Sequence, residues 1–357
     1  MKKLTRLNLF VLILLLSKIS SAQLGADIEK VDIHTNREFS YSSYENKIEK
    51  FYRFKDTLYA VGKFQQINGI PCNNIAKYDG KKWLQLGDTK ENKYAYDIIE
   101  YRGELYVSGQ WDNAYVVKRW TGKEWKSFGT KSKKDGYSFE AFIIGEYNLS
   151  IKVLSMAVFN DELYCGGILQ PIGSTNASVI KWDGYKWSKL GENREFDLAS
   201  ITSLVVFNNK LYMGAQSPYG FDQENFCPLL EWDVTSLKKI YMQRKMEKRL
   251  GDAGVDKLIV FNNEIYISNE YGIMRWDGSE NALLYSRGRV ENMSIINDHL
   301  VFANGSWYND ANKQVVLIDK SKNLTYIKMI GAKCYHWPPI YSDGKKTFLP
   351  YVSNCAL

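Results

Sequence analysis

The feature that most constrains this chain is an internal repeat, a short hairpin-like element that recurs along its length. Clear copies are FKDTLYAVG (54–62), YRGELYVSG (101–109), FNDELYCGG (159–167), FNNKLYMGA (207–215) and FNNEIYISN (261–269). Two weaker copies follow, INDHLVFAN (296–304) and YSDGKKTFLPY (341–351). Between Leu58 in the first copy and Phe348 in the last lie 290 residues, so the mean period is roughly 48. A period of this length predicts a fold in which each repeat forms one supersecondary unit.

Each copy predicts two antiparallel strands, because an alternating apolar run precedes and follows a short turn of Asn, Asp, Gly or Lys. A second predicted hairpin follows in six of the repeats. Its copies are IAKYDGKKWLQLG (75–87), VVKRWTGKEWKSFG (116–129), VIKWDGYKWSKLG (179–191), LLEWDVTSLKKIY (229–241), IMRWDGSENALLY (273–285) and VVLIDKSKNLTYI (315–327). Four antiparallel strands per repeat are the blade of a β-propeller, so the sequence predicts an all-β chain with a single propeller.

The number of blades depends on how the two ends of the chain are used. The copy at 341–351 has no second hairpin after it, whereas segment 23–47 precedes the first hairpin and is long enough for two short strands. Strands from both ends would close the terminal blade and remove an open sheet edge. We therefore expect seven four-stranded blades, with six as the alternative if the end segments only cap the ring.

The tryptophans of the second hairpins recur in phase with the repeat, at Trp120, Trp125, Trp182, Trp187, Trp232 and Trp276. Such rings can stack on sugars, but residues that recur in every blade are expected to pack one blade against the next. Functional residues should instead lie where the repeats differ.

The repeat motifs, LYxGG followed by KWDGxxWxxLG, resemble those of the kelch and galactose-oxidase-like β-propeller superfamily, and most closely those of its secreted repeat proteins. The resemblance extends over nearly the whole chain after residue 22 and implies the propeller fold. It implies little about function, because the motifs are structural. The sequence departs from kelch repeats, since the double glycine is present only at Gly166-Gly167.

Residues 1–22 are predicted to be a cleaved signal peptide. Basic residues precede the apolar run FVLILLL (10–16), and Ser20-Ser21-Ala22 provides small residues for cleavage after Ala22. The run is too short to span a membrane, which takes about 20 residues, so we expect no transmembrane anchor. The propeller domain would then comprise residues 23–357, and the protein would be secreted, periplasmic or on the cell exterior.

The remaining composition argues against several classes of partner and cofactor. Without Lys2, Lys3, Arg6 and Lys18, 43 basic residues face 40 acidic ones, a net charge of +3, which gives little support for nucleic-acid binding. Only three histidines and no CxxC motif occur, so we expect no metal site and no cofactor. Cys334 and Cys355 are a candidate disulfide in an oxidising compartment, the alternative being buried free thiols, which we prefer for Cys165.

Candidate binding residues are sought in the connections between hairpins, which vary in length while the hairpin turns stay short. In a propeller these two sets of loops lie on opposite faces, and variable loops are where binding residues concentrate. The variable connections are 64–73, 110–114, 130–150, 168–176, 217–228, 242–257 and 305–312. They combine aromatic rings with carboxylates at Trp111, Asp112, Tyr115, Tyr219, Phe221, Asp222, Trp307, Tyr308 and Asp310. This combination suits recognition of carbohydrate or peptide; the alternative is that the rings only attach the loops to the rim.

No catalytic motif accompanies these residues. The histidine ligands of copper-radical oxidation, an arginine cluster of the sialidase kind and the GxSxG, P-loop and dinucleotide-binding patterns have no match. The sequence therefore predicts a monomeric, non-catalytic recognition or scaffold module that binds an extracellular glycan or protein through its long-loop face. The alternative is a carbohydrate-active enzyme, a glycosidase or lyase, that uses paired carboxylates such as Asp112, Asp222 or Asp310.

Overall fold

The computed structural model describes residues 27–34, 47–111, 114–127, 152–168, 179–190, 200–216, 229–240, 254–286, 288–303, 314–328 and 339–352. These residues form strands, turns and short connections, and no helix occurs among them. Within these ranges there is accordingly no helix that could cross a membrane. The predicted signal peptide, residues 1–22, lies outside the described residues.

The described strands form seven sheets, so the chain is a seven-bladed β-propeller as predicted and not the six-bladed alternative. Blade 1 contains β2 (Lys47–Phe54), β3 (Thr57–Lys63), β6 (Ile75–Tyr78) and β7 (Trp83–Gln85). Blade 2 contains β8 (Asn92–Tyr101), β9 (Glu104–Trp111), β10 (Ala114–Trp120) and β11 (Trp125–Ser127). Blade 3 contains β12 (Lys152–Phe159), β13 (Glu162–Ile168), β14 (Val179–Trp182) and β15 (Trp187–Lys189).

The second half of the chain forms the other four blades. Blade 4 contains β16 (Ser200–Phe207), β17 (Lys210–Gln216), β18 (Leu229–Trp232) and β19 (Leu237–Ile240). Blade 5 contains β20 (Lys257–Phe261), β21 (Glu264–Asn269), β22 (Gly272–Trp276) and β23 (Asn281–Tyr285). Blade 6 contains β24 (Met293–Ile296), β25 (His299–Ala303), β26 (Gln314–Ile318) and β27 (Leu324–Lys328). Blade 7 combines β28 (Tyr341–Ser342) and β29 (Lys346–Val352) with β1 (Asp27–His34), β4 (Gln66–Ile67) and β5 (Ile70–Pro71).

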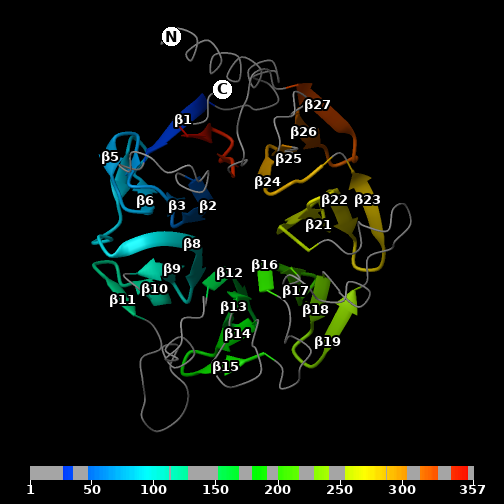
Figure 1. The fold of residues 1–357 in the computed structure, drawn as a ribbon, viewed down its shortest axis with the longest axis horizontal. Helices are drawn as coiled ribbons and strands as arrows, with labels where there is room; N and C mark the ends of the chain where they lie inside the picture. Colours follow the sequence, from blue (N-terminus) through cyan, green and yellow to red (C-terminus); the bar gives the residue numbers. More distant parts are fainter. Residues whose placement is uncertain are drawn as a thin grey trace.

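The blades are arranged around a common axis, with the first strand of each blade innermost (Figure 1). The inner strands β2, β8, β12, β16, β20, β24 and β28 contact one another in this order. β28 lies in the same sheet as β29, which contacts β2, so blade 7 adjoins both blade 6 and blade 1. The residues that face the middle of the molecule therefore come from these inner strands.

Tight turns end both hairpins of each blade on the same face, which we call the short-turn face. The first hairpins turn through two residues with positive φ, for example Asn160 (48°) and Asp161 (59°). In five of the six second hairpins an aspartate caps the turn, and in blade 2 Thr121 does so. In blade 5, for example, Asp277 Oδ1 accepts hydrogen bonds from the backbone N–H groups of Ser279 and Glu280, each 2.8 Å long. These hydrogen bonds lower the pKa of Asp277.

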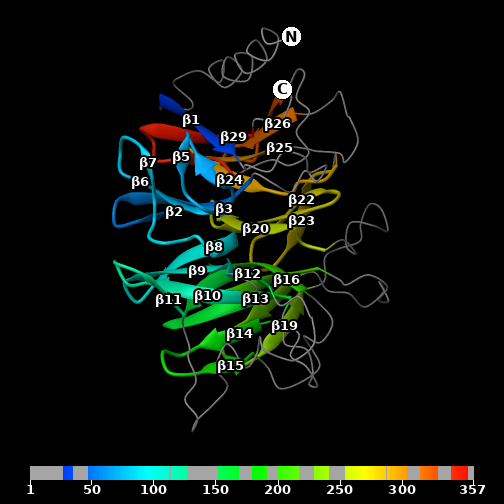
Figure 2. The same cartoon turned by 60° about the vertical axis from the view of Figure 1, so that its left-hand side comes forward.

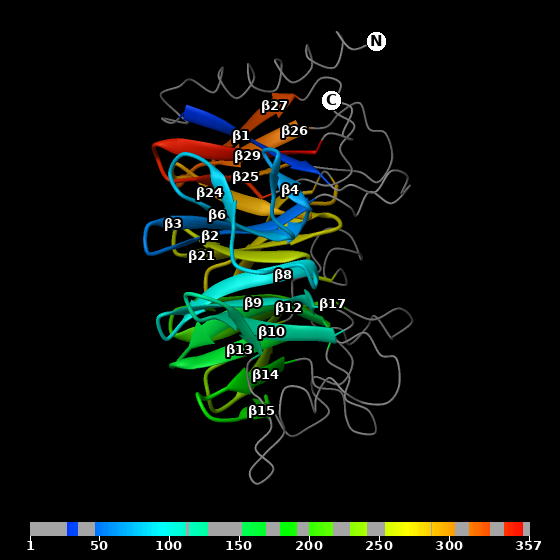
Figure 3. The ribbon, with the colours of Figure 1, turned by 90° about the vertical axis from the view of Figure 1, so that its left-hand side faces the viewer.

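The opposite face carries the connections between hairpins, and we call it the connection face. Each inner strand runs toward a short turn, so its first residues lie at the connection face. In the edge-on view of Figure 3 the β2–β3 turn projects on the left, the side of the short-turn face.

The phased tryptophans pack between blades, which confirms the prediction for them. Trp187 is 3% exposed and packs with residues of blades 2 and 3, while Trp276 is 5% exposed and packs with residues of blades 4 and 5. Trp125 lies between blades 1 and 2, where its Nε1–H donates a 2.7 Å hydrogen bond to Leu86 O. Large flat rings therefore fill the space between adjacent twisted sheets.

Both ends of the described chain meet in blade 7, as predicted. β1 pairs in parallel with β29 over seven residues, from Asp27 opposite Lys346 to Ile33 opposite Val352 (Figure 2). Val31 and Ile33 are fully buried and pack with Phe348 and residues of blade 1.

The N-terminal segment supplies one described strand to blade 7, however, and not two. The outer strands are β4 and β5, a hairpin that branches from blade 1 and pairs with the end of β1. Asp32 N–H donates to Asn68 Oδ1 at 2.6 Å, and Asn68 N–H donates to Asp32 O at 2.7 Å. Connection 64–73, expected to be a binding loop, is therefore part of the scaffold, and blade 7 has five strands.

Candidate functional site

Most of the predicted binding residues cannot be placed, because they lie in connections outside the described residues. Only Trp111 has a described side chain, and Tyr115 is placed through its backbone in β10 alone. The predicted residues outside the description are Asp112, Tyr219, Phe221, Asp222, Trp307, Tyr308 and Asp310, together with the candidate disulfide Cys334 and Cys355.

Trp111 lies at the end of β9, at the connection face, but its ring is 4% exposed. It packs between blades 1 and 2, with its ring centroid 5.7 Å from that of Trp125, while Lys118 Nζ lies 4.3 Å from the Trp111 ring. Burial lowers the pKa of Lys118. This environment suits a packing residue, and it leaves little of the indole for a ligand.

A second candidate site lies on the inner strands of blades 1–5. It involves one residue of each strand, the one four positions before the strand's last residue. In blades 2, 3 and 4 this residue is an acceptor for the next blade. Asp97 Oδ2 accepts a hydrogen bond from Met156 N–H at 2.6 Å. Ser155 Oγ accepts from Leu204 N–H and Ser203 Oγ from Leu258 N–H, each at 3.0 Å. We call this residue the acceptor position; its role is to tie adjacent blades together near the axis.

Lysine occupies the acceptor position in blades 1 and 5, as Lys50 and Lys257. An ammonium group has three donors and no acceptor, so neither lysine can accept a backbone N–H from the next blade. Each lysine also follows an acid, in the pairs Glu49-Lys50 and Asp256-Lys257. The repeat therefore departs from its scaffold pattern twice, in the same way, on inner strands.

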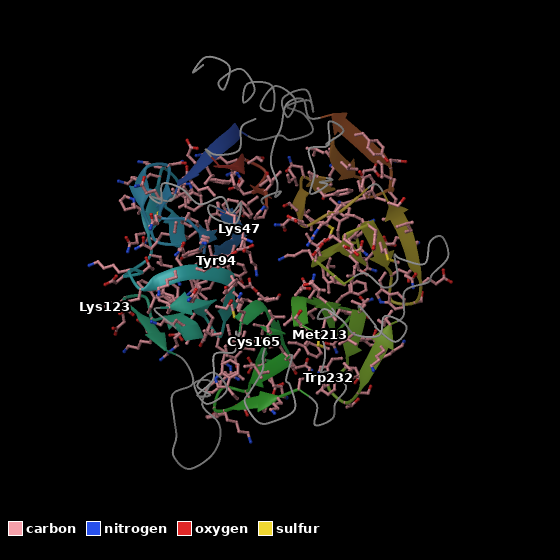
Figure 4. All side chains as sticks on the ribbon, in the orientation of Figure 1. Lys47, Tyr94, Lys123, Cys165, Met213 and Trp232 are labelled. Atoms are coloured by element: carbon pink, nitrogen blue, oxygen red, sulfur yellow. The ribbon has the colours of Figure 1, made fainter. Side chains whose placement is uncertain are left out.

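Around Lys50 each lysine forms an ion pair with a carboxylate. Lys50 Nζ lies 2.6 Å from Asp97 Oδ1, and Asp97 is 5% exposed. Lys47 Nζ lies 2.6 Å from Glu49 Oε1, and the same carboxylate accepts a hydrogen bond from the Tyr94 hydroxyl. Lys47 and Tyr94 are labelled beside the middle of the ring in Figure 4, whereas Lys123 lies at its rim.

Lys257 reaches the same charges from the other side. Burial lowers its pKa, and the charges that act on it most are those of Asp97, Lys50, Glu49 and Lys47. Those four residues belong to blades 1 and 2 and Lys257 belongs to blade 5, so these charges act on one another across the axis. Among the described residues no ion pair or hydrogen bond involves the Lys257 ammonium.

We call the six residues Lys47, Glu49, Lys50, Tyr94, Asp97 and Lys257 the axial cluster. Three ammonium groups face two carboxylates, so the cluster has one positive charge in excess. The side chains of Lys47 and Lys50 are 28% and 29% exposed, and that of Glu49 is 22% exposed, so solvent reaches these groups. The cluster can therefore hold an anionic group against the partly buried ammonium of Lys257.

Tyrosine rings line the cluster on the side of blades 1 and 2. The ring centroids of Tyr94 and Tyr96 are 4.3 Å apart, and Lys47 Nζ lies 5.7 Å from the Tyr94 ring. Lys50 Nζ lies 5.3 Å from the ring of Tyr52. Burial and the adjacent Glu49 carboxylate raise the pKa of Tyr94, so its hydroxyl remains a donor at neutral pH.

Asp256, the residue before Lys257, is paired with an arginine from a later segment of the chain. Arg289 holds Asp256 through two hydrogen bonds, from Nη2 to Oδ1 at 2.8 Å and from Nε to Oδ2 at 3.1 Å. Burial raises the pKa of Asp256 to about 6, and Arg289 opposes this rise. Glu291 Oε1 lies 3.5 Å from Arg289 Nε.

Metal and thiol chemistry have little support in the described part of the chain. No group of three or more His, Cys, Asp or Glu residues there could hold a metal ion. Cys72 and Cys165 are buried free thiols, which confirms the preference for Cys165. Burial raises the pKa of Cys72 to about 12, so both are packing residues and neither is a reactive thiolate.

Sequence reasoning missed the axial cluster, although a signal for it was present. EKFYRFKDTLY (49–59) and DKLIVFNNEIY (256–266) share an acid–lysine pair at the same repeat phase, where blades 3 and 4 have serine. Comparing the residues just before each hairpin motif would have identified both lysines.

Comparison with solved structures shows β-propellers. The extracellular domain of the putative one-component system BT4673 from B. thetaiotaomicron superposes with a TM-score of 0.52 at 14% identity, over 83% of this chain and 36% of that protein. The GH74 enzyme of Niastella koreensis gives 0.52 at 10% identity, over 79% of this chain and 45% of the enzyme. YCF48 bound to D1 peptide gives 0.50 at 11% identity, over 87% of this chain and 92% of YCF48.

These similarities support the fold, since identities of 10–14% do not establish a shared function. The chain spans less than half of the length of the first two proteins, 36% and 45%. No family model matches the sequence, and no curated protein matches it either. The kelch and galactose-oxidase-like resemblance therefore remains a resemblance of repeat motifs.

Proposed function

We propose that this protein is a secreted, non-catalytic recognition module that binds an extracellular glycan or protein ligand on its connection face, at the axis. The observation that carries the proposal is Lys257, a partly buried residue on an inner strand whose ammonium group has no ion-pair or hydrogen-bond partner among the described residues. A protein stabilises such a group when a ligand pairs with it.

The position of the cluster supports entry of a ligand from the connection face. Lys47 is the first residue of β2, and inner strands begin at that face. Lys257 pairs with Ser268 as Lys50 pairs with Val61, so it lies further along the axis, at the level of Lys50. The connections predicted to bind ligand start from the same face, so their aromatic residues and the axial cluster can contribute to one site.

Two of the structural neighbours agree with an extracellular or ligand-binding role for such a propeller. The BT4673 neighbour is an extracellular domain, and YCF48 was solved with a bound peptide. In support of secretion, the sequence has the predicted cleavage site after Ala22.

A carbohydrate-active enzyme is the second candidate, and Asp256 is the observation that favours it. A carboxyl group whose pKa is raised to about 6 suits general acid catalysis, and a GH74 enzyme is among the neighbours. Asp256 is held by two hydrogen bonds from Arg289, however, which suits an ionised structural carboxylate better than a proton donor.

Binding of the purified protein to an array of glycans and peptides tests the proposal. The aromatic residues of the connections are tested with Tyr219→Ala and Trp307→Ala, and Tyr185→Ala serves as a control because Tyr185 is 89% exposed in a turn on the short-turn face. We expect a specific ligand whose binding is reduced by changes on the connection face and retained by the control.

Turnover of the bound ligand distinguishes the two candidates. The recognition module should return every bound glycan unchanged, whereas an enzyme should cleave it and lose that activity in Asp256→Asn. Absence of any specific ligand from folded protein would contradict the proposal.

A further inference from the structure

We propose that the axial cluster binds the carboxylate of an acidic saccharide and that Lys257 is the residue that pairs with this carboxylate. This inference rests on the proposed function, because it names the ligand class of the same site.

The charge balance favours a ligand with one negative charge at the axis. Lys50 is paired with Asp97 and Lys47 with Glu49, each at 2.6 Å. Lys257 is the ammonium left over, and the two other lysines add positive charge around it. One carboxylate placed against Lys257 would neutralise the cluster.

The two carboxylates of the cluster restrict what else the ligand can carry. Glu49 and Asp97 would repel a second nearby anion, so a run of acidic side chains in a peptide fits poorly. Both oxygens of Asp97 already accept hydrogen bonds, but Glu49 Oε2 accepts none from the described residues and the side chain is 22% exposed, so a ligand with hydroxyl groups beside its carboxylate fits. One carboxylate and several hydroxyl groups on a compact ring describe a sugar acid.

The tyrosine rings agree with this class. Tyr52, Tyr94 and Tyr96 lie among the lysines of blades 1 and 2 and are partly exposed. Aromatic rings beside polar groups are typical of sites that orient a ligand through a few hydrogen bonds and apolar contact.

Lys257 is also a residue that the scaffold does not require. The acceptor position of blades 3 and 4 carries serine, which links each blade to the next through a backbone N–H. A lysine there gives up that link and adds a partly buried charge, so packing between the blades does not account for it, whereas an anionic ligand would.

The test uses Lys257→Met, which removes the charge but keeps the aliphatic chain, and Lys257→Ser, which restores the residue of blades 3 and 4. Lys239→Met is the matched control, since Lys239 is exposed on β19. Circular dichroism and the thermal midpoint establish that each variant folds, and Lys257→Ser is expected to be at least as stable as the native protein.

The probes are glucuronate-, galacturonate-, mannuronate- and guluronate-containing oligosaccharides, the same oligosaccharides with each carboxyl reduced to the alcohol, and acidic peptides. Isothermal titration is expected to show binding of at least one carboxylated saccharide. Reduction of its carboxyl, Lys257→Met and Lys257→Ser should each weaken binding at least about tenfold, while Lys239→Met should not.

Three results would overturn the inference. Equal binding by the native protein and the Lys257 variants would remove Lys257 from the site. Preference for the reduced saccharide, or for an acidic peptide, would assign a different ligand class while leaving the recognition function in place. If none of the saccharides or peptides binds the folded protein, both the inference and the proposed function fail.

Discussion

At the scale of the residue, the turns of the second hairpins show how closely this repeat controls backbone geometry. Four of these turns place glycine after the first turn residue, at Gly80, Gly122, Gly184 and Gly278, with φ between 90° and 106°. In blade 4 the same place is taken by Val234 at φ 85°. A β-branched residue in this region is strained, and hydrogen bonds from Thr235 and Ser236 to Asp233 hold the turn in place.

Val234→Gly is therefore expected to stabilise the protein. The left-handed region costs an L-residue roughly 1–2 kcal/mol, and glycine gives back part of this through its flexibility in the unfolded chain, so the net gain should be about 1 kcal/mol. Val234 is 41% exposed, so little burial is lost. The thermal midpoint of the variant measures the gain.

The matched control is Gly278→Val, which places valine at the equivalent turn of blade 5 and should lower the midpoint. An unchanged or lower midpoint in Val234→Gly would show that the turn is not strained.

At the scale of the element, adjacent blades are linked by side chains that accept backbone N–H groups of the next inner strand. Asp97 is the most connected of them, because it accepts from Met156 N–H, from Ile98 N–H and from the ammonium of Lys50. Its carboxylate is 5% exposed. Blades 1, 2 and 3 thus meet at one buried side chain.

Asp97→Ala should destabilise the protein by about 3 kcal/mol, because it leaves a buried N–H group and a partly buried ammonium without their acceptor. Asp97→Ser restores the acceptor found in blades 3 and 4 and should recover part of that loss. Denaturant unfolding of both variants gives the comparison. Equal stabilities for the alanine and serine variants would show that the acceptor position does not link the blades.

At the scale of the whole molecule, the propeller could be predicted because the repeat encodes it locally. The motifs around Leu58, Leu163 and Ile265 set strand, turn and strand within a few residues, and the phase of the tryptophans predicts packing between blades. The β4–β5 hairpin could not be predicted in the same way, since it pairs with β1 at a distance of more than 30 residues, as between Asp32 and Asn68.

The candidate site, like the fold, could be predicted from the sequence only in part. The aromatic residues selected from the connections were chosen by composition, and Trp111 proves to be buried between blades, where a stacking role has little surface. Lys50 and Lys257 stand far apart in sequence, and only the ring places them across one axis from each other. Their common phase in the repeat was visible in the sequence, but their shared environment was not.

Binding of ligand at the axis, on the connection face, is tested by a crystal structure of the protein with a saccharide that it binds. We expect the ligand between the inner strands β2, β8 and β20, with its carboxylate within hydrogen-bonding distance of Lys257 Nζ. A ligand on the short-turn face or on the outer strands, with Lys257 not in contact, would contradict it.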